Sequence, residues 1–557
     1  MKPAAWLQKF GAALETGDID AAAAMFEPDG YWRDLVALTW NIQTSEGRAE
    51  IKAMLAATLA AAKPRRFQAK TDEWFTFETA VGRGVGHMRF RDKGKHCWTL
   101  LTTLQELKGF EEKAGVNRIK IPLTRKPSQP YVLIVGGGQG GIALAARLKR
   151  LEVPAIVVEK NERAGDSWRK RYKSLCLHDP VWYDHMPYIP FPDHWPVFSP
   201  KDKIADWLEM YTRVMELDYR GSTLCKRACY DEQAGEWEVL VIRGGEPQTL
   251  RPKHLVLATG MSGFPNAPEI PGSESFAGRL VHSSQYAGGA EWKGKQCVVV
   301  GSGTSGHDIC ADLFEQGAAS VTMIQRAPTI VARSETLMDL AWGPLYSEQA
   351  LARGITTEIA DLTVASVPHR VLPELQKPLY KTMHQRDAEM YAGLEQAGFQ
   401  CTFGEDGSGI HALYLRRGAG YYIETGASQM IIDGKIRLKS GVHVEGLKEG
   451  TVVLSDNTEL PADLVVFATG YGSMNQWARE LISDAVAEKV GMCWGLGSDT
   501  KGDPGPWEGE LRNMWKPTQQ PNLWFHGGNL MQSRHYSLYL ALQLKARMEG
   551  IPTPVYQ

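Results

Sequence analysis

A short run of apolar residues, Tyr131-Val-Leu-Ile-Val135, is followed directly by a glycine-rich turn, Gly136-Gly-Gly138-Gln-Gly-Gly141. An amphipathic stretch from Ile142 to Leu151 then leads to a second apolar run, Ala155 to Val158. Apolar runs of this length are typical of strands buried on both faces of a parallel sheet, and the stretch between them has helical periodicity. The pattern predicts a strand–turn–helix–strand unit.

The glycines of this turn have the spacing of a dinucleotide-binding fingerprint. We expect Gly136 to form the tight turn, Gly138 to let the backbone approach a pyrophosphate, and Gly141 to let helix and strand pack closely. The helix N-terminus would face the phosphates, and Glu159, after the second strand, would bind an adenosine ribose. The candidate residues for this first nucleotide are Gly136, Gly138, Gln139, Gly140, Gly141, Glu159 and Lys160.

The same pattern occurs a second time. An apolar strand, Gln296 to Val300, precedes the turn Gly301-Ser-Gly303-Thr-Ser-Gly306. A predicted helix from Asp308 to Gln316 and a strand from Ser320 to Ile324 follow it. The candidate residues for a second nucleotide are Gly301, Ser302, Gly303, Thr304, Ser305 and Gly306.

Two further apolar runs each end in Ala-Thr-Gly, at Gly260 and at Gly470, where glycine permits a close backbone approach. Two fingerprints, each accompanied by such a strand, predict two dinucleotides on one chain. The predicted fold class is α/β, with two Rossmann-type dinucleotide-binding domains.

The two units differ where the ribose would bind. The first ends in Glu159, which suits the bare ribose diol of FAD, whereas the second ends in Gln325-Arg326. Arg326 can pair with a 2′-phosphate or stack on adenine, so the second site suits a nicotinamide nucleotide, NADPH in preference to NADH. The alternative for Arg326 is a solvated surface arginine.

Residues 1–115 have a different pattern, that of a separate α+β domain. Apolar residues recur at helical spacing from Trp6 to Leu14, and three stretches between Glu73 and Leu104 have the pattern of an antiparallel meander. This order resembles the nuclear-transport-factor-2-like (SnoaL-like) cone, particularly Phe26 to Trp40 with Gly47-Arg48. The resemblance implies a pocket that Asp34, His87 and Trp98 could line; the favoured alternative is a docking or dimerising module with an ordinary core.

A polar, basic segment with three prolines, residues 116–130, is typical of an interdomain linker. We expect these domains: 1–115, the cone domain; 131–282, the first part of the FAD-binding domain; 283–460, the NAD(P)-binding domain with a helical insertion at 333–400; and 461–557, the second part of the FAD-binding domain.

Charge and composition exclude several classes of partner. The net charge of −2 gives no sign of a nucleic-acid or anionic-membrane partner. No apolar run approaches the roughly 18 residues that span a bilayer, and no secretory signal is seen at the N-terminus. The eight scattered cysteines fit the reduced thiols of a cytoplasmic protein.

Two other segments are candidates for contact with a flavin. Gly165-Asp-Ser-Trp168 would turn beneath a bulky planar ligand, although Trp168 could also be a core aromatic. Near the C-terminus a strand ends in Gly-Gly-Asn529-Leu530 and leads to a predicted helix, Tyr536 to Glu549, whose positive end could face a flavin carbonyl.

Between the two fingerprints lies Phe276-Ala-Gly278-Arg-Leu-Val-His282-Ser-Ser-Gln-Tyr286. This segment matches FxGxxxHxxxY, the signature of class B flavoprotein monooxygenases, which include flavin-containing and Baeyer–Villiger monooxygenases. The resemblance spans roughly residues 130 to 550 and includes Gly165 to Trp168 and Phe467 to Tyr471. With its extra N-terminal domain, the chain is most similar to the type II flavin-containing monooxygenases.

The resemblance implies an activity and the residues that carry it. NADPH would reduce FAD, and a C4a-peroxyflavin would insert one atom of O2 into ketones and oxidise sulfides. His178 and Asp179 lie where the family has residues beside the flavin. Baeyer–Villiger enzymes have aspartate there and place an arginine against the flavin in the segment that holds Arg416 and Arg417. Asp179, Arg417 and Arg416 are thus the catalytic candidates, without a choice between the arginines; His282 would support a loop.

Three other functions remain open. A disulfide-reductase type would need a redox cysteine pair beside the flavin, where Cys176 stands alone. An N-hydroxylating or indole-pyruvate-type monooxygenase shares the fold and cofactors, and a non-catalytic nucleotide-binding protein is the alternative from another class. The expected assembly is a cytoplasmic homodimer that binds neither nucleic acid nor membrane.

Overall fold

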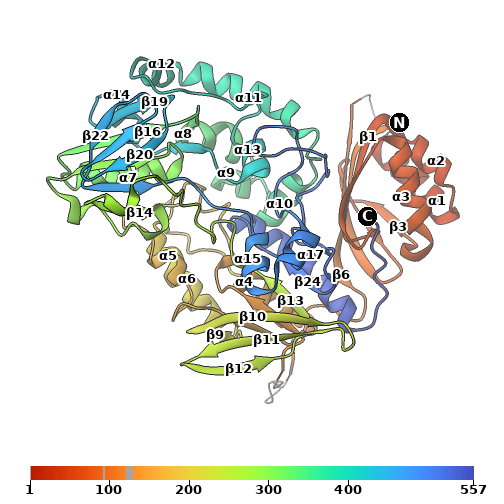
Figure 1. The fold of residues 1–557 in the computed structure, drawn as a ribbon. Coiled ribbons are helices and arrows are strands. Elements are labelled where there is room, and N and C mark those ends of the chain that lie inside the picture. The colour runs from red at the N-terminus through yellow and green to blue at the C-terminus, as the bar shows by residue number, and fades with distance from the viewer. Residues whose placement is uncertain (1, 92–94, 121–128) are drawn as a thin grey trace.

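The structure is a computed structural model that describes residues 2–91, 95–120 and 129–557. Among these residues, the N-terminal region, red to orange in Figure 1, is a six-stranded sheet with helices on one face. The helices are α1 (Pro3–Thr16), α2 (Ile19–Ala24) and α3 (Gly47–Ala62). The strands in sheet order are β2 (Ile42–Glu46), β1 (Phe26–Leu35), β6 (Cys97–Leu107), β5 (Gly82–Phe90), β4 (Trp74–Glu78) and β3 (Arg65–Ala69).

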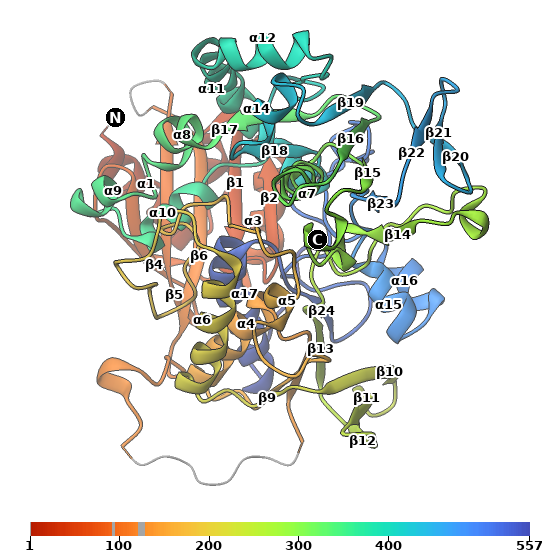
Figure 2. The same ribbon diagram turned by 90° about the vertical axis from the view of Figure 1, so that its left-hand side faces the viewer.

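The N-terminal region has a core of its own that continues into the rest of the molecule. Trp6 and Phe10 lie one helical turn apart on α1 and stack with ring centroids 4.7 Å apart, against the buried Phe26 and Trp32. One hydrophobic cluster extends from these residues through α17 (Leu530–Met548) into the first parallel sheet. The region is therefore docked on the rest of the chain and not merely tethered to it (Figure 2).

The first predicted dinucleotide unit forms a five-stranded parallel sheet. Its three central strands are almost fully buried, because helices pack on them and the antiparallel strands within residues 223–250 contact them as well. The strands in sheet order are β24 (Leu523–Phe525), β13 (His254–Leu257), β7 (Val132–Val135), β8 (Ala155–Val158) and β9 (Tyr219–Arg220). The helices beside it are α4 (Gln139–Arg150), α5 (Asp166–Arg169), α6 (Lys201–Val214) and α17.

The second unit forms a separate five-stranded parallel sheet and corrects two expected boundaries. Its strands in sheet order are β14 (Arg279–His282), β23 (Leu464–Phe467), β15 (Gln296–Val300), β16 (Ser320–Gln325) and β19 (Arg437–Ser440). We placed β14 at the end of 131–282 and β23 at the start of 461–557, both in the FAD-binding domain. Both strands instead pair in the second sheet, where β23 lies between β14 and β15.

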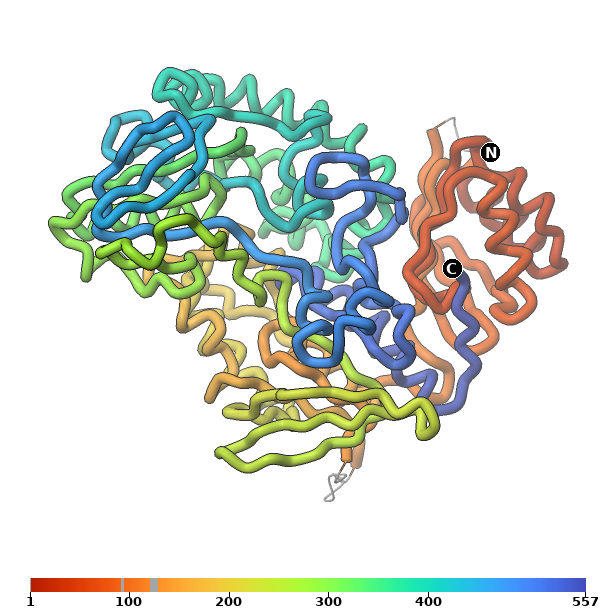
Figure 3. The backbone as a smooth tube through the Cα atoms, viewed as in Figure 1, coloured from red at the N-terminus to blue at the C-terminus, as the bar shows by residue number. Residues whose placement is uncertain are grey.

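The remaining elements surround these two sheets (Figure 3). Two antiparallel meanders are β10 (Thr223–Asp231), β11 (Glu236–Arg243) and β12 (Glu246–Leu250), and β20 (Val444–Lys448), β21 (Thr451–Leu454) and β22 (Glu459–Pro461). The segment expected to be a helical insertion contains α8 (Ser334–Leu337), the π-helical turn η5 (Met338–Trp342), α9 (Glu348–Ala352), α10 (Thr357–Ala365), α11 (Leu372–Arg386) and α12 (Ala388–Gln396). Two further strands pair with each other, β17 (Ile330–Arg333) and β18 (Tyr421–Glu424). The remaining helices are α7 (Thr304–Glu315), α13 (Gly409–Arg417), α14 (Ala427–Ile432), α15 (Asn475–Leu481) and α16 (Asp484–Val490). The short turns are η1 (Gly115–Asn117), η2 (Ser273–Ser275), η3 (Ser283–Gln285) and η4 (Ala290–Trp292).

Three helices begin earlier than the apolar pattern predicts. α4 and α7 begin inside the glycine turns, at Gln139 and Thr304, because the third glycine of each turn already has helical geometry. α17 begins at Leu530, six residues before the expected Tyr536, because Asn529 caps it and forms a capping box with Gln532. Within the described residues, no helix is both long enough and apolar enough to cross a bilayer. Of the expected linker, residues 121–128 lie outside the described part of the chain.

Candidate functional site

The first glycine turn leaves an open cradle at its centre. Gly136 has φ +108, and a Cβ there would lie 2.3 Å from the Ala258 carbonyl oxygen, so only glycine fits. A Cβ on Gly141 would lie 2.0 Å from the Gly136 oxygen. At Gly138, by contrast, a Cβ would meet nothing within 4 Å. Gly138 is also the N-cap of α4, so the open space lies where the backbone N–H groups of that helix point.

Glu159 stands at the carboxyl end of β8, next to this cradle. One carboxylate oxygen accepts from the Gly137 backbone N–H at 2.8 Å, and the other accepts from the backbone and side-chain N–H groups of Asn161. These bonds fix the carboxylate at the edge of the turn, where a ribose hydroxyl can reach its remaining lone pairs. Lys160, the next residue, is exposed.

The N-terminus of α17 completes the first site. Gln139 donates to the Gly528 carbonyl oxygen at 3.2 Å, and Gly140 packs against Gly527, so the C-terminal Gly-Gly turn lies directly on the first glycine turn. The Asn529 side chain caps α17, and Leu530 is buried in the next position. Trp168 is half-buried on α5 and packs against the cluster that contains Leu530. The residues present thus fit a dinucleotide whose flavin end lies near α17.

The second glycine turn repeats the geometry of the first. Gly301 has φ +123, with a hypothetical Cβ 2.3 Å from the Ala468 oxygen, and a Cβ on Gly306 would lie 2.1 Å from the Gly301 oxygen. Gly303, the N-cap of α7, has φ −84 and ψ −172, close to the −79 and −171 of Gly138. A Cβ on Gly303 would meet only the Tyr421 oxygen, at 3.6 Å.

Polar groups of the second turn hold its neighbours in place. The Ser302 hydroxyl shares a 2.6 Å hydrogen bond with Thr329, and Thr304 donates to the Tyr421 carbonyl oxygen at 3.0 Å. Ser305 lies half-buried in the first turn of α7. Gly470 has φ +81 and open space at its Cβ position, after β23. The second site therefore has the same open cradle, and it fits a second dinucleotide.

The two residues that follow Ile324 differ sharply in their surroundings. Gln325 is fully buried, and its amide group is bonded to the backbone of Gln400 and to Ser440. Arg326 is exposed, and no carboxylate of the described residues forms an ion pair with it. A free guanidinium at this edge can bind a phosphate, whereas Gln325 is already saturated by its own contacts.

The segment that contains His178 and Asp179 lies between the two cradles. The His178 ring lies 6.0 Å from the Tyr421 ring, on the side of the second turn. Tyr183, five residues later, accepts a 3.0 Å hydrogen bond from the Asn529 side chain, on the side of α17. The segment thus connects both predicted nucleotide sites.

Burial disfavours the charged forms of the titratable side chains in and around this segment. It raises the pKa of Asp179, although nearby His178 partly offsets the shift. Asp184 is 2% exposed, and burial together with Asp179 raises its pKa well above the ordinary value. The same effect lowers the pKa of His411 to about 4. Burial also raises the pKa values of Tyr183 and Tyr414, with a smaller contribution from Asp179.

The two candidate arginines have different surroundings. Arg416 donates to the Asp406 carboxylate at 2.7 Å and to the Ser408 hydroxyl, and its side chain is 9% exposed. Arg417 is exposed at the end of α13, beside Gly502. Neither guanidinium forms an ion pair with Asp179 in the described part of the chain.

The residues of the FxGxxxHxxxY segment contact β23, the loop after it and α7, all within the second unit. Phe276 is buried, and a Cβ on Gly278 would lie 2.6 Å from the Asp463 oxygen. His282 contacts the Gly470 carbonyl oxygen at 3.0 Å, and Tyr286 donates to Asp312 of α7 at 2.7 Å. The imidazole therefore supports the loop after β23.

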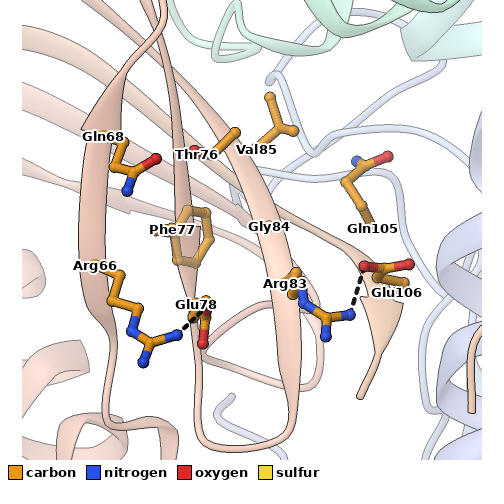
Figure 4. Close-up of a pocket in the computed structure, with 10 residues that line it drawn as sticks. All are labelled: Arg66, Gln68, Thr76, Phe77, Glu78, Arg83, Gly84, Val85, Gln105 and Glu106. Atoms are coloured by element: carbon orange, nitrogen blue, oxygen red, sulfur yellow. Dashed lines mark hydrogen bonds and ion pairs between the residues drawn. The ribbon is translucent and has the colours of Figure 1, made fainter. Parts of the chain in front are cut away.

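The three residues expected to line an N-terminal pocket are engaged or buried. Asp34 accepts hydrogen bonds from Leu38, Thr39 and Thr102, which satisfy its carboxylate. His87 is buried, and the indole N–H of Trp98 has no partner among the described residues. A cavity of about 580 Å³ does occur in this region, but Figure 4 shows it on the sheet surface, where none of the three contributes.

Several residues around Asp179 were missed by sequence reasoning. They are Tyr183, Asp184, Asp361, Tyr414 and Arg534, and all are buried or half-buried. Arg534 lies in a polar run, Gln532-Ser-Arg-His535, which the sequence alone does not distinguish from an exposed first turn, although the structure buries all four residues. The partner of Arg534, Asp361, lies 173 positions away in the sequence, so no local pattern could reveal it.

Comparisons with known proteins agree with this geometry. Residues 130–366 match the family model described as pyridine nucleotide-disulphide oxidoreductase. Indole-3-pyruvate monooxygenase YUCCA1 of Oryza sativa subsp. japonica is 28% identical over 64% of this chain and 82% of its own length. Probable indole-3-pyruvate monooxygenase YUCCA7 of Arabidopsis thaliana is 29% identical over 62% of this chain and 76% of its own.

Solved structures share the fold at low sequence identity. A cyclohexanone monooxygenase bound to epsilon-caprolactone has a TM-score of 0.54 at 16% identity, with 76% of this chain and 88% of that chain covered. The OTEMO complex with FAD and NADP also has a TM-score of 0.54, at 17% identity over 76% of this chain and 85% of that chain. At this level of identity the solved structures show the fold alone: the chain shares its architecture with a structure solved with FAD and NADP.

Proposed function

We propose that the chain is an NAD(P)H-dependent FAD monooxygenase that inserts one oxygen atom from O2 into ketones and also oxidises sulfides. The observation that carries this proposal is the pair of matching glycine cradles, one beside a carboxylate and the other beside a free arginine. That pairing suits FAD in the first site and NADPH in the second.

Each cofactor would be held by residues of its own unit. Gly138, Glu159 and the N-terminus of α17 would hold FAD, with Trp168 against its ring system. Gly303, Thr304 and Arg326 would hold NADPH. Reduced FAD supplies the electrons that activate oxygen. The chain would orient the substrate and exclude water, because the buried segment from His178 to Tyr183 lies between the two sites.

The environment of that segment favours an uncharged substrate. A substrate carboxylate there would be disfavoured by the same burial that raises the pKa values of Asp179 and Asp184, and the nearby cation Arg534 is already paired with Asp361. Tyrosine hydroxyls can donate to a neutral carbonyl oxygen without burying a charge. A ketone therefore suits the site better than an oxoacid.

Asp179 and Arg417 remain the proposed catalytic groups. Arg416 is engaged by Asp406, so Arg417 is the one of the two arginines with a free guanidinium. A cation that stabilises negative charge developing during oxygen transfer is commonly worth about 3 kcal/mol. We propose that Arg417 has this role and that Asp179 orients it and the nicotinamide amide.

A second candidate is oxidation of an aryl oxoacid. It is favoured by the names of the relatives, which are indole-3-pyruvate monooxygenases at 28–29% identity. The proposal further includes a nuclear-transport-factor-2-like domain at residues 1–115, a linker at 116–130, and a cytoplasmic homodimer. With β14 and β23 reassigned, the NAD(P)-binding unit would run from residue 279 to residue 467.

A substrate panel tests the proposal. FAD-loaded protein is supplied with NADPH and with cyclic ketones, sulfides, amines or indole-3-pyruvate, and products are identified by mass spectrometry. We expect esters or lactones from the ketones. Arg417→Ala should leave flavin reduction by NADPH largely intact and abolish ester formation, whereas the control Arg386→Ala should retain both.

The other outcomes separate the alternatives. Decarboxylation of the oxoacid without ester formation would establish the second candidate. Full ester formation by Arg417→Ala would remove Arg417 from the mechanism but leave the class intact. Protein that binds FAD yet consumes no NADPH would contradict the whole proposal.

A further inference from the structure

The C-terminal end of α10 is capped by two arginines of the N-terminal region. Arg33 of β1 donates to the Ala365 carbonyl oxygen at 2.6 Å. Arg89 of β5 donates to the Ser366 carbonyl oxygen at 2.9 Å and to its hydroxyl at 2.7 Å. The last carbonyl groups of a helix lack intrahelical partners and carry partial negative charge, so cations at this end stabilise the helix.

The middle of α10 is tied to the flavin side of the molecule. Asp361 accepts two 2.8 Å hydrogen bonds from Arg534 of α17, in a bidentate pair, and a third from Tyr346 at 2.9 Å. The two paired side chains are 5% and 4% exposed. A buried bidentate pair of this kind fixes distance and orientation together, because removing either partner leaves an uncompensated buried charge.

Arg534 also holds the segment that lies between the two cradles. Its remaining terminal nitrogen donates to the Tyr183 carbonyl oxygen at 2.8 Å and to the His185 carbonyl oxygen at 2.6 Å. The Tyr183 hydroxyl in turn meets Asn529, the residue that caps α17. Charge-assisted hydrogen bonds at the end and in the middle of α10, joined by the helix itself, therefore connect the sheet of the N-terminal region to the segment that contains Asp179.

We propose that the N-terminal region positions the segment from Asp179 to His185 through α10, with Arg33 and Arg89 as positioning residues at one end and Arg534 at the other. This inference rests on the proposed function only in taking that segment as a wall of the oxygenation site. The region thereby acts on the chemistry without contributing a group that touches substrate or cofactor.

Arg89 is the best residue for a test. Arg33 also forms a bidentate pair with Glu510, so its removal would disturb more than α10. Arg89 is half-buried; it contacts Thr99 of β6 at 3.4 Å, and among the described residues its hydrogen bonds outside the N-terminal region are those to Ser366. Arg83 lies on the same strand and is exposed, with its hydrogen bonds to Glu106 and Glu111 of the N-terminal region. Arg83→Ala is therefore a matched control.

Hydrogen–deuterium exchange on the full-length, FAD-loaded protein measures whether a change at Arg89 reaches both α10 and residues 183–185. Arg89→Ala should speed amide exchange at least tenfold in residues 357–366 and also in residues 183–185, since the end of α10 loses two charge-assisted hydrogen bonds. Arg89→Lys should restore part of the protection, and Arg83→Ala should match the parent in both segments. Arg534→Lys should loosen residues 183–185 and leave the end of α10 protected.

A second readout is the fraction of consumed NADPH that yields oxygenated product and not hydrogen peroxide. We expect Arg89→Ala to lower this fraction while the rate of flavin reduction stays within twofold of the parent. Faster exchange confined to α10, or an unchanged fraction despite faster exchange at 183–185, would overturn the proposal. Faster exchange at both segments in a protein that oxygenates no substrate would support the connection and instead contradict the proposed function.

Discussion

At the scale of single residues, the position after the second Rossmann strand distinguishes the two nucleotide sites. In the first unit it is Glu159, held by backbone N–H groups at the edge of the glycine turn. In the second it is Gln325, whose amide is used entirely inside the protein, and the polar function passes to Arg326. If both sites hold nucleotides as proposed, one fold would present a carboxylate to one ribose and a guanidinium to the other.

Arg326→Ala tests which coenzyme the second site selects. Loss of a guanidinium–phosphate contact should raise the KM for NADPH about tenfold to a hundredfold and change the KM for NADH by less than about threefold, because only NADPH carries the 2′-phosphate. Steady-state oxidation of the two coenzymes measures the ratio. Arg437→Ala is the control, since Arg437 pairs opposite Thr322, away from the carboxyl end of the strand. Equal weakening of both coenzymes would exclude the role.

At the scale of elements, each glycine turn contains two kinds of position: some have no room for a Cβ, and one has ample room. Gly136 and Gly141 are glycines because the protein's own backbone leaves no room for a Cβ. Gly138 has ample room and an ordinary φ of −79, so the protein alone gives no reason for glycine there. The space at Gly138 is explained by a ligand that fills it.

Gly138→Ala should therefore weaken FAD binding, whereas Gly141→Ala should lower the stability of the fold. Gly138→Ala should leave the melting temperature of the FAD-free protein within about 1 °C of the parent and weaken FAD binding at least tenfold, since the methyl group occupies space for the pyrophosphate. Gly141→Ala should lower the melting temperature of the FAD-free protein by several degrees, because its Cβ would overlap the Gly136 oxygen. Calorimetry and flavin-fluorescence titration measure the two effects. A Gly138→Ala protein that binds FAD normally would show that the cradle holds no nucleotide.

At the scale of the whole molecule, the sequence predicted the parallel sheets better than their boundaries. The glycine spacing and apolar runs identify both Rossmann units because these signals are local. The pairing of β14 with β23, and hence the limits of the second unit, depends on strands 182 positions or more apart in sequence, which periodicity cannot match. Asp179 was found through its segment, but Arg534 and Asp361 were not, because their pairing is tertiary.

Docking of the N-terminal region should depend on the buried pair between Arg33 and Glu510. Arg33 makes two 2.7 Å bonds to this carboxylate, which hold the pKa of Glu510 well below its ordinary value. Arg33→Met should destabilise the protein by about 3–5 kcal/mol, since it removes the bidentate cation from a buried carboxylate that keeps contacts with His369 and Thr44. The parent's advantage should be present above the ordinary carboxyl pKa of 4.5 and decline as pH falls below it.

Denaturant midpoints of the two proteins between pH 4 and pH 8 measure this dependence. The double variant Arg33→Met with Glu510→Gln should recover part of the lost stability, because the orphaned charge is gone. An Arg33→Met protein as stable as the parent at pH 7 would mean that other contacts hold the N-terminal region.

The sheet order has a consequence for biosynthesis. β24 pairs with β13, and α17 packs on α4, yet both come from residues 523–548, far downstream of the first glycine turn. A nascent chain that has already made the first glycine turn still lacks the partner surface for α4. Its apolar strands therefore stay exposed to chaperones or to aggregation until α17 has left the ribosome. Flavin capture should accordingly follow the synthesis of α17.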